Sequence, residues 1–137
     1  MSAYVLDASY ALAWCFEDRA TPATDESLRR LQREEDTVIV PVIWRVEVPN
    51  ALGKAVTRGK ISIATALGMW AGLEKRPIRD VPGGDVPELI RLATGHGIFV
   101  YDANYLRAAI VSDLPLATND NQLASVASKV GVALMRP

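Results

Sequence analysis

The stretch Tyr4-Val-Leu-Asp-Ala-Ser9 decides the fold, because a short apolar run ends in an aspartate and helix-forming residues follow at once. Tyr4 to Leu6 predicts a buried strand, and Ser9 to Glu17 predicts a helix with Ser9 as its N-cap. Asp7 then lies in the turn between them. Ligands bind α/β sheets at the carboxyl ends of the strands, so Asp7 is a candidate site residue.

Three further acidic residues also stand at the ends of apolar runs. They are Glu47 in Pro41-Val-Ile-Trp-Arg-Val-Glu47, Asp102 in Val100-Tyr-Asp-Ala103 and Asp120 in Leu116-Ala-Thr-Asn-Asp120. Carboxylates gathered at one sheet edge repel one another unless they hold a cation or shift their pKa values. The pattern predicts a divalent-metal site, although Asp7 or Asp120 alone could be a helix N-cap and Glu47 alone a surface residue.

Strand and helix patterns alternate along the rest of the chain. The predicted strands are 38–40, 76–81 at an edge, 114–118 and 132–135, and the predicted helices are 22–35, 42–58, 63–74, 87–94 and 121–129. Thr21 is expected to cap the first of these helices, and Gly59, Gly95 and Gly131 to end later ones. This order predicts a three-layer α/β/α sandwich on a mainly parallel sheet of about five strands, with residues 1–137 in one domain.

Two segments stay open at this point. Pro49 falls inside the predicted helix 42–58, where a proline removes a hydrogen bond, so this helix is either kinked near Glu47 or starts later than Val42. Residues 98–101 have strand propensity, whereas the spacing of apolar residues over 102–111 is helical.

Composition limits the function classes. Half of the 137 residues are hydrophobic, and 15 basic and 16 acidic residues give a net charge of −1. Such a balance gives no global attraction for nucleic acid, so any basic surface must be local. Three groups could form one, unless they are only solvated helix faces: Arg29 with Arg30, Lys54 with Arg58 and Lys60, and Arg76 with Arg79.

Several single residues have structural interpretations. Cys15 is the only cysteine, which excludes an internal disulfide, and we expect it in the core. His96 is expected in a loop, and Trp44 and Trp70 in packing. The apolar runs are too short to span a membrane, and the first residues lack the basic region of a signal peptide. We therefore expect a cytoplasmic protein with no membrane partner.

Four blocks taken together resemble the PIN-domain ribonucleases, in particular the VapC-type toxins of toxin–antitoxin pairs. The blocks are Val5-Leu-Asp-Ala-Ser9, Pro41-x-x-Trp44-x-x-Glu47-x-x-Asn50-Ala-Leu52, Tyr101-Asp-Ala-x-Tyr-Leu106 and Leu116-Ala-Thr-Asn-Asp120. The resemblance implies that Asp7, Glu47, Asp102 and Asp120 form the acidic quartet that holds catalytic Mg²⁺ or Mn²⁺. It also implies supporting polar roles for Ser9, Asn50 and Thr118. Pro49 departs from the family's glutamate helix.

The resemblance further implies a metal-dependent endoribonuclease with an RNA substrate, a cognate antitoxin and a homodimeric assembly. Exposed apolar residues at Ala66, Met69, Trp70 and Leu73 could supply the dimer interface. Mg²⁺ takes only one or two carboxylates directly, so the remaining acids would hold water. Alternatives are a nuclease for single-stranded or flap DNA, and a module that binds RNA without cleaving it. A phosphatase of the haloacid-dehalogenase type is disfavoured, because Ser9 stands where its second aspartate would be.

Overall fold

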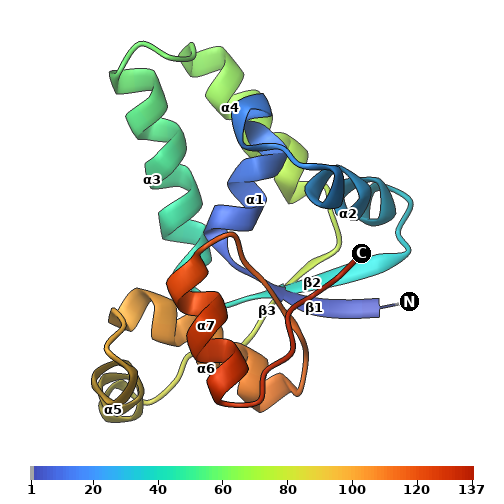
Figure 1. Ribbon diagram of the computed structural model, residues 1–137. Helices are drawn as coiled ribbons and strands as arrows, with labels where there is room; N and C mark the ends of the chain where they lie inside the picture. The colour runs from blue at the N-terminus through green and yellow to red at the C-terminus, as the bar shows by residue number, and fades with distance from the viewer. Residues whose placement is uncertain (1) are drawn as a thin grey trace.

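The computed structural model describes residues 2–137 as a sheet between two layers of helices (Figure 1). The strands are β1 (Ser2–Leu6), β2 (Asp36–Val40), β3 (Ile78–Asp80) and β4 (Leu116–Ala117). The helices are α1 (Ala8–Cys15), the short 3-10 helix η1 (Glu17–Arg19), α2 (Pro22–Gln32), α3 (Trp44–Thr57), α4 (Ile63–Glu74), α5 (Val86–His96), α6 (Val100–Ser112) and α7 (Asn121–Lys129). The three-layer α/β/α fold predicted from the sequence is confirmed.

The sheet is parallel throughout and has the order β3-β2-β1-β4. In Figure 1, α1 to α4 lie on one side of the sheet and α5 to α7 on the other. The order of strands reverses at β1, whose neighbours are β2 on one side and β4 on the other. Such a switch point opens a crevice at the carboxyl ends of the strands, directly before Asp7 and Thr118.

The expected fifth strand is the main difference from the predicted sheet. The segment 132–135 contributes only one parallel bridge, between Leu116 and Leu134. Edge strand β3 forms where it was predicted, but it is limited to three residues. Short strands at both edges leave the long hydrogen-bonded pairing to β1 and β2 at the centre.

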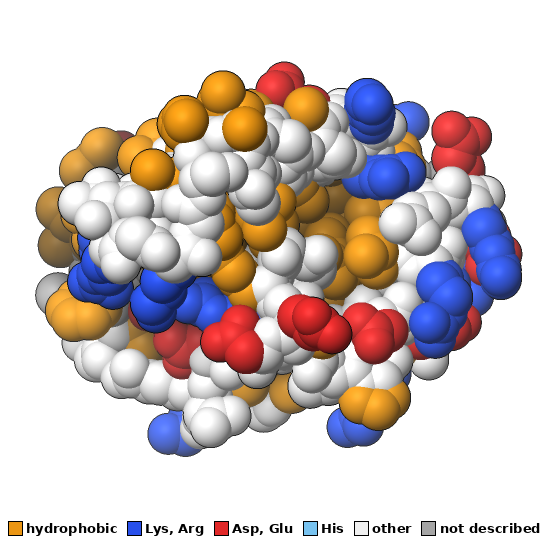
Figure 2. Space-filling view, turned by 90° about the horizontal axis from the view of Figure 1, so that it is seen from above, with side chains coloured by type: hydrophobic (Ala, Val, Ile, Leu, Met, Phe, Trp, Pro, Cys, Tyr) orange, Lys and Arg blue, Asp and Glu red, His pale blue; other side chains and the backbone are white. Residues whose placement is uncertain are grey.

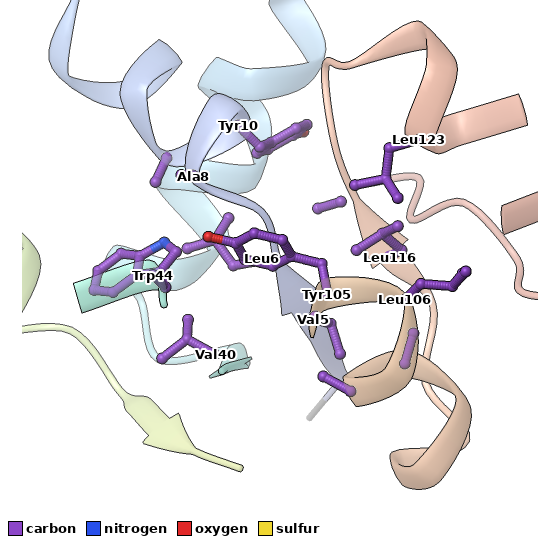
Figure 3. Packing of buried hydrophobic residues seen from close by; sticks show 14 of the residues in the cluster. Val5, Leu6, Ala8, Tyr10, Val40, Trp44, Tyr105, Leu106, Leu116 and Leu123 are labelled. Atoms are coloured by element: carbon purple, nitrogen blue, oxygen red, sulfur yellow. The ribbon is translucent and has the colours of Figure 1, made fainter. Parts of the chain in front are cut away.

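Central side chains from every layer meet in one hydrophobic core (Figure 3). Leu6 and Val40 come from the sheet, Trp44 from the start of α3 and Leu106 from α6, and each is completely buried. Trp44 also packs against Trp70 in a tilted arrangement with ring centroids 5.6 Å apart, which confirms the predicted packing role of both residues. This packing fixes the first turn of α3 against the sheet.

Helix boundaries correct several expectations. Asp7, not Ser9, is the N-cap residue of α1, and Ser9 lies within the helix. Helix α5 continues to His96 and ends at Gly97, which has φ +66°, so Gly95 does not end it and exposed His96 is not a loop residue. Gly97 can adopt this left-handed conformation because it has no Cβ. Cys15 is only partly buried, at the edge of the core.

Both open segments take a definite form. Helix α3 starts at Trp44, two residues later than Val42, and Pro49 lies in its second turn. The segment 98–101 is not a strand, because α6 already begins at Val100. Capping by Thr21 is confirmed, since its hydroxyl accepts from the Thr24 amide and the Thr24 hydroxyl accepts from the Thr21 amide.

None of the described helices combines the length and apolar character that a membrane crossing requires.

Candidate functional site

Asp7 occupies the switch point at the end of β1 and is 4% exposed. The hydroxyls of Ser9 and Thr118 both donate to its Oδ2 atom, at 2.7 Å and 2.6 Å. Burial raises the pKa of Asp7, and the two hydroxyls partly oppose this rise. Because both hydroxyls donate to Oδ2, no side chain within residues 2–137 donates to Oδ1, although the Ala8 amide also lies close to the carboxylate.

The backbone after β4 completes this network. The Asn119 amide donates to Ser9 Oγ and the Asp120 amide donates to Thr118 Oγ1, each at 3.0 Å. Two hydroxyls thus connect the turn after β1 to the turn after β4, although these turns are more than 100 residues apart in the chain. Ser9 and Thr118 therefore both contact Asp7, and the supporting role that the family resemblance implies for them stays a prediction.

Glu47 is half-buried in the first turn of α3. Its Oε1 atom is inaccessible to solvent and has no hydrogen-bond partner among residues 2–137. Desolvation, followed by the charges of Asp7 and Asp102, raises its pKa to about 7, and the nearby Tyr105 hydroxyl partly offsets this rise. A buried carboxylate oxygen without a donor is costly unless a proton or a cation compensates it.

Asp102 and Asp120 complete the group from the far side of the sheet. Asp102 lies in the first turn of α6, and burial together with the charges of Asp120 and Asp7 raises its pKa to about 6. Asp120 is the N-cap of α7, where its Oδ1 atom accepts from the Leu123 amide at 2.9 Å. Asp120 is therefore a helix cap, as one interpretation of the sequence proposed, and its Oδ2 atom remains available.

The four acids share one placement and affect one another. Each is the N-cap or lies in the first turn of its own helix: Asp7 in α1, Glu47 in α3, Asp102 in α6 and Asp120 in α7. The charge of Asp7 raises the pKa of Glu47 and of Asp102, and Asp120 acts in the same direction on Asp7 and Asp102. The fold thus gathers all four predicted acids into one cluster, called the acid cluster below.

The donor chemistry of the acid cluster fits a hard divalent cation. It offers only oxygen atoms, and two of them, Asp7 Oδ1 and Glu47 Oε1, lack a side-chain donor. Over residues 2–137, no three acidic, histidine or cysteine side chains are arranged to ligate a single ion. Mg²⁺ usually takes one or two carboxylates and keeps several waters, so a direct set of three is not required.

Comparison with known families agrees with this geometry. A family model described as PIN domain matches residues 4–129. The chain belongs to the PIN-domain family. PIN domains are generally nucleases, and a cluster of carboxylates at the end of a parallel sheet suits that chemistry.

Two solved structures share this PIN-domain fold. A structure described as PAE2754 from Pyrobaculum aerophilum is 23% identical over 90% of this chain and 78% of its own, with a TM-score of 0.73. A structure of VapBC2 from Rickettsia felis, bound to a DNA fragment from their promoter, is 13% identical over 97% of both chains, with a TM-score of 0.68. No curated protein matches the sequence.

Asn50 is the predicted site residue that this PIN domain does not bring into the acid cluster. It is exposed on α3, and within the described chain it forms no hydrogen bond with the acids. Asn50 instead lines a surface groove with Arg45 and Lys54. One helical turn from Glu47 therefore suffices to place a side chain outside the cluster.

Tyr105 is a neighbour of the acids that sequence analysis did not single out. Its ring is completely buried, and its hydroxyl lies beside Glu47 without forming a hydrogen bond of normal geometry. Burial and the charges of Glu47 and Asp7 strongly raise the pKa of Tyr105, so the hydroxyl stays protonated and can donate. The available signal was its spacing, since Tyr105 follows Asp102 by three residues on α6.

Proposed function

We propose that the protein is a metal-dependent endoribonuclease and the toxin of a toxin–antitoxin pair. The observation that carries this proposal is the acid cluster at the carboxyl end of the sheet, in which burial and neighbouring carboxylates raise the pKa values of Asp7, Glu47 and Asp102. A divalent cation would relieve the repulsion among these carboxylates and could stabilise the charge that develops during hydrolysis of a phosphodiester. Membership of a family of nucleases supports the reaction class.

Each acid has a role that follows from its surroundings. Asp7, Asp102 and Asp120 would hold Mg²⁺ or Mn²⁺, with Glu47 contacting the ion directly or through water. When bound, the ion supplies charge neutralisation at the scissile phosphate and activates a water for in-line attack. Ser9 and Thr118 fix the orientation of Asp7 by donating to Oδ2, so Oδ1 would be the oxygen that Asp7 offers to an ion.

The remaining assignments concern partners. The structure of VapBC2, which shares the fold over 97% of both chains, supports a toxin assembled with an antitoxin. We also propose a homodimer, by family resemblance alone. The α4 surface that the sequence suggested as the dimer interface is not fully exposed, because Ala66 and Leu73 are buried within the protomer. Light scattering at micromolar concentration measures the assembly state, and a monomer would refute the dimer.

Cleavage of end-labelled RNA tests the proposal. Single-stranded and hairpin RNA would be incubated with the wild type, Asp7→Asn and Asp25→Asn, each with Mg²⁺, with Mn²⁺ and with chelator. Asp25 is an exposed aspartate of α2, so its variant controls for the loss of one negative charge. We expect cleavage by the wild type and Asp25→Asn only, and only with metal.

The alternatives give different results in the same experiment. Full activity of Asp7→Asn would refute the site. A module that only binds RNA would retain its affinity in chelator and release no product with any metal. Preferential cleavage of matched DNA oligonucleotides would indicate the DNA nuclease that the sequence left open.

A further inference from the structure

Two adjoining hollows lie along α3, away from the acid cluster. One, of about 810 Å³, follows the outer side of the helix, and the other, of about 430 Å³, lies between the end of α3 and η1. Lys54 and Arg58 line both hollows, so the two form one continuous groove around the end of α3. This groove, called the α3 groove below, is distinct from the acids in position and in charge.

The hollow between the end of α3 and η1, called the inner hollow, is lined by four basic side chains: Arg19, Lys54, Arg58 and Lys60. All four are exposed, and none forms an ion pair with any residue in 2–137. Asp18 is the one acidic residue in that lining. Because the whole chain has a net charge of −1, this is a local excess of positive charge, not a consequence of composition.

Within the described chain, these cations share their unpaired state with other basic residues, such as Arg33 and Lys129, but the four groove cations line one hollow together. Arg30 is bound to Asp36, Arg45 to Asp80 and Arg29 to Glu26, all at 2.8–2.9 Å. Long basic side chains with no intramolecular carboxylate remain free to bind an external anion. In the view from above, lysine and arginine side chains stand in groups around a face whose hollow is lined by hydrophobic side chains (Figure 2).

The α3 groove continues the line of the site. Glu47, Lys54 and Arg58 follow one another at seven and four residues, so they lie on one stripe of α3. At about 1.5 Å of rise per residue, Lys54 lies about 10 Å and Arg58 about 16 Å beyond Glu47 along the helix axis. A chain that crosses the acid cluster can therefore reach both cations without leaving α3.

Arg19 adds a planar group at the far end of the groove. Its guanidinium lies over the ring of Phe16, 5.2 Å from the ring centroid, and both residues line the inner hollow. This contact holds Arg19 against the groove wall while its hydrogen-bond donors remain exposed. Arginine in this arrangement suits phosphate recognition, because its donors match two phosphate oxygens.

We propose that the α3 groove binds the phosphodiester backbone of single-stranded RNA outside the scissile bond, with Lys54 and Arg58 as its central phosphate contacts. This proposal rests on the proposed function, since it assigns a path to the same substrate. An acidic segment of a protein partner is the competing occupant. The RNA backbone is favoured because the cations extend along one helix from the acids, as the charges of a polymer crossing the site require.

The test separates binding from cleavage. Asp7→Asn serves as the parent, and Lys54→Gln with Arg58→Gln is added to it. The matched control adds Arg33→Gln with Lys129→Gln to the same parent. Arg33 is the C-cap residue of α2, as Arg58 is of α3. Lys129 lies in the last turn of α7, as Lys54 does in α3. Fluorescence anisotropy with a single-stranded RNA oligonucleotide is measured in chelator from 50 to 200 mM salt.

Counterion release sets the expected loss of RNA affinity. Each phosphate contact to a single strand contributes about 0.7 to the slope of log K against log salt, so two lost contacts should lower the slope by about 1.4 and the affinity about 25-fold at 0.1 M salt. The control pair should change the affinity less than about threefold. A thermal unfolding midpoint equal to that of the parent shows that each variant is folded.

Each result has one interpretation. Equal losses for the groove and control pairs would mean general charge attraction and would overturn the groove. Unchanged RNA affinity with lost binding of polyglutamate would make the groove a protein-docking site, which also overturns the proposal. If the wild type cleaves RNA while the variant with Lys54→Gln and Arg58→Gln binds RNA as tightly as its parent, only the groove proposal is refuted. If the wild type neither cleaves nor binds RNA, the proposed function is refuted as well.

Discussion

Glu47→Gln should stabilise the folded protein at neutral and alkaline pH in the absence of metal. Glu47 has a pKa of about 7 in the fold, above its ordinary value of 4.5, because of burial and the charges of Asp7 and Asp102. Between these two values the folded state binds more protons than the unfolded state. The free energy of unfolding of the wild type therefore falls as pH rises through this window, and glutamine removes that fall.

The structure gives the size of the effect. A pKa difference of about 2.5 corresponds to about 3.4 kcal/mol at about 1.36 kcal/mol for each pKa unit. Glu47 is only half-buried, so solvent screening reduces this value, and we expect about 1.5 kcal/mol. For a chain of this length, that stabilisation raises Tm by about 5 °C.

The assay is thermal and urea unfolding in chelator at pH 4.5 and pH 8. The two proteins should be nearly equal at pH 4.5, where Glu47 is protonated in the fold, and should differ most at pH 8. Glu74→Gln is the matched control, because Glu74 is exposed at the end of α4. Millimolar Mg²⁺ should stabilise the wild type more than Glu47→Gln, since the cation compensates the same charge.

A destabilised Glu47→Gln variant at pH 8 would refute this reasoning. So would a stability difference that stays constant from pH 4.5 to pH 8, because it would show that shape or hydrogen bonding, not ionisation, is responsible.

Three other substitutions test parts of the fold and the site. Thr118→Val removes one of the two donors to Asp7, so Mn²⁺ affinity measured by calorimetry should fall about tenfold or more; unchanged affinity would show that this donor does not orient Asp7. Thr21→Ala breaks the capping box of α2 and should cost about 1 kcal/mol in urea unfolding, with no effect on metal affinity. Gly84→Ala places a Cβ against the side chain of Arg107, so it should displace that arginine and cost about 1 kcal/mol; a neutral variant would mean that Arg107 moves freely.

Much of the fold and the candidate site could be predicted from the sequence, because strongly local patterns determine both. The apolar runs before Asp7 and Asp120 form strands whose ends the parallel pairing brings together. Helices 63–74 and 121–129 form within their predicted bounds, since their apolar spacing and caps agree. The catalytic role of the four acids stays a prediction.

The remainder depended on contacts that one sequence does not display. Segment 98–101 has β-branched and aromatic residues, yet Val100 begins α6, because that helix packs across the sheet and leaves no partner strand there. The fifth strand is reduced to a bridge because β4 itself is two residues long. Asn50 lies away from the acids and Tyr105 lies beside Glu47 for a similar reason, since the face of a helix that meets the acids depends on packing.

The position of every acid at the start of a helix has a consequence for the metal-free protein. Aligned peptide dipoles place a partial positive charge at a helix N-terminus, and an anion in the first turn gains about 0.3–1 kcal/mol from it. Four such termini, those of α1, α3, α6 and α7, hold the acid cluster. The backbone itself therefore offsets part of the repulsion among the four carboxylates, which favours folding of the chain before any cation binds.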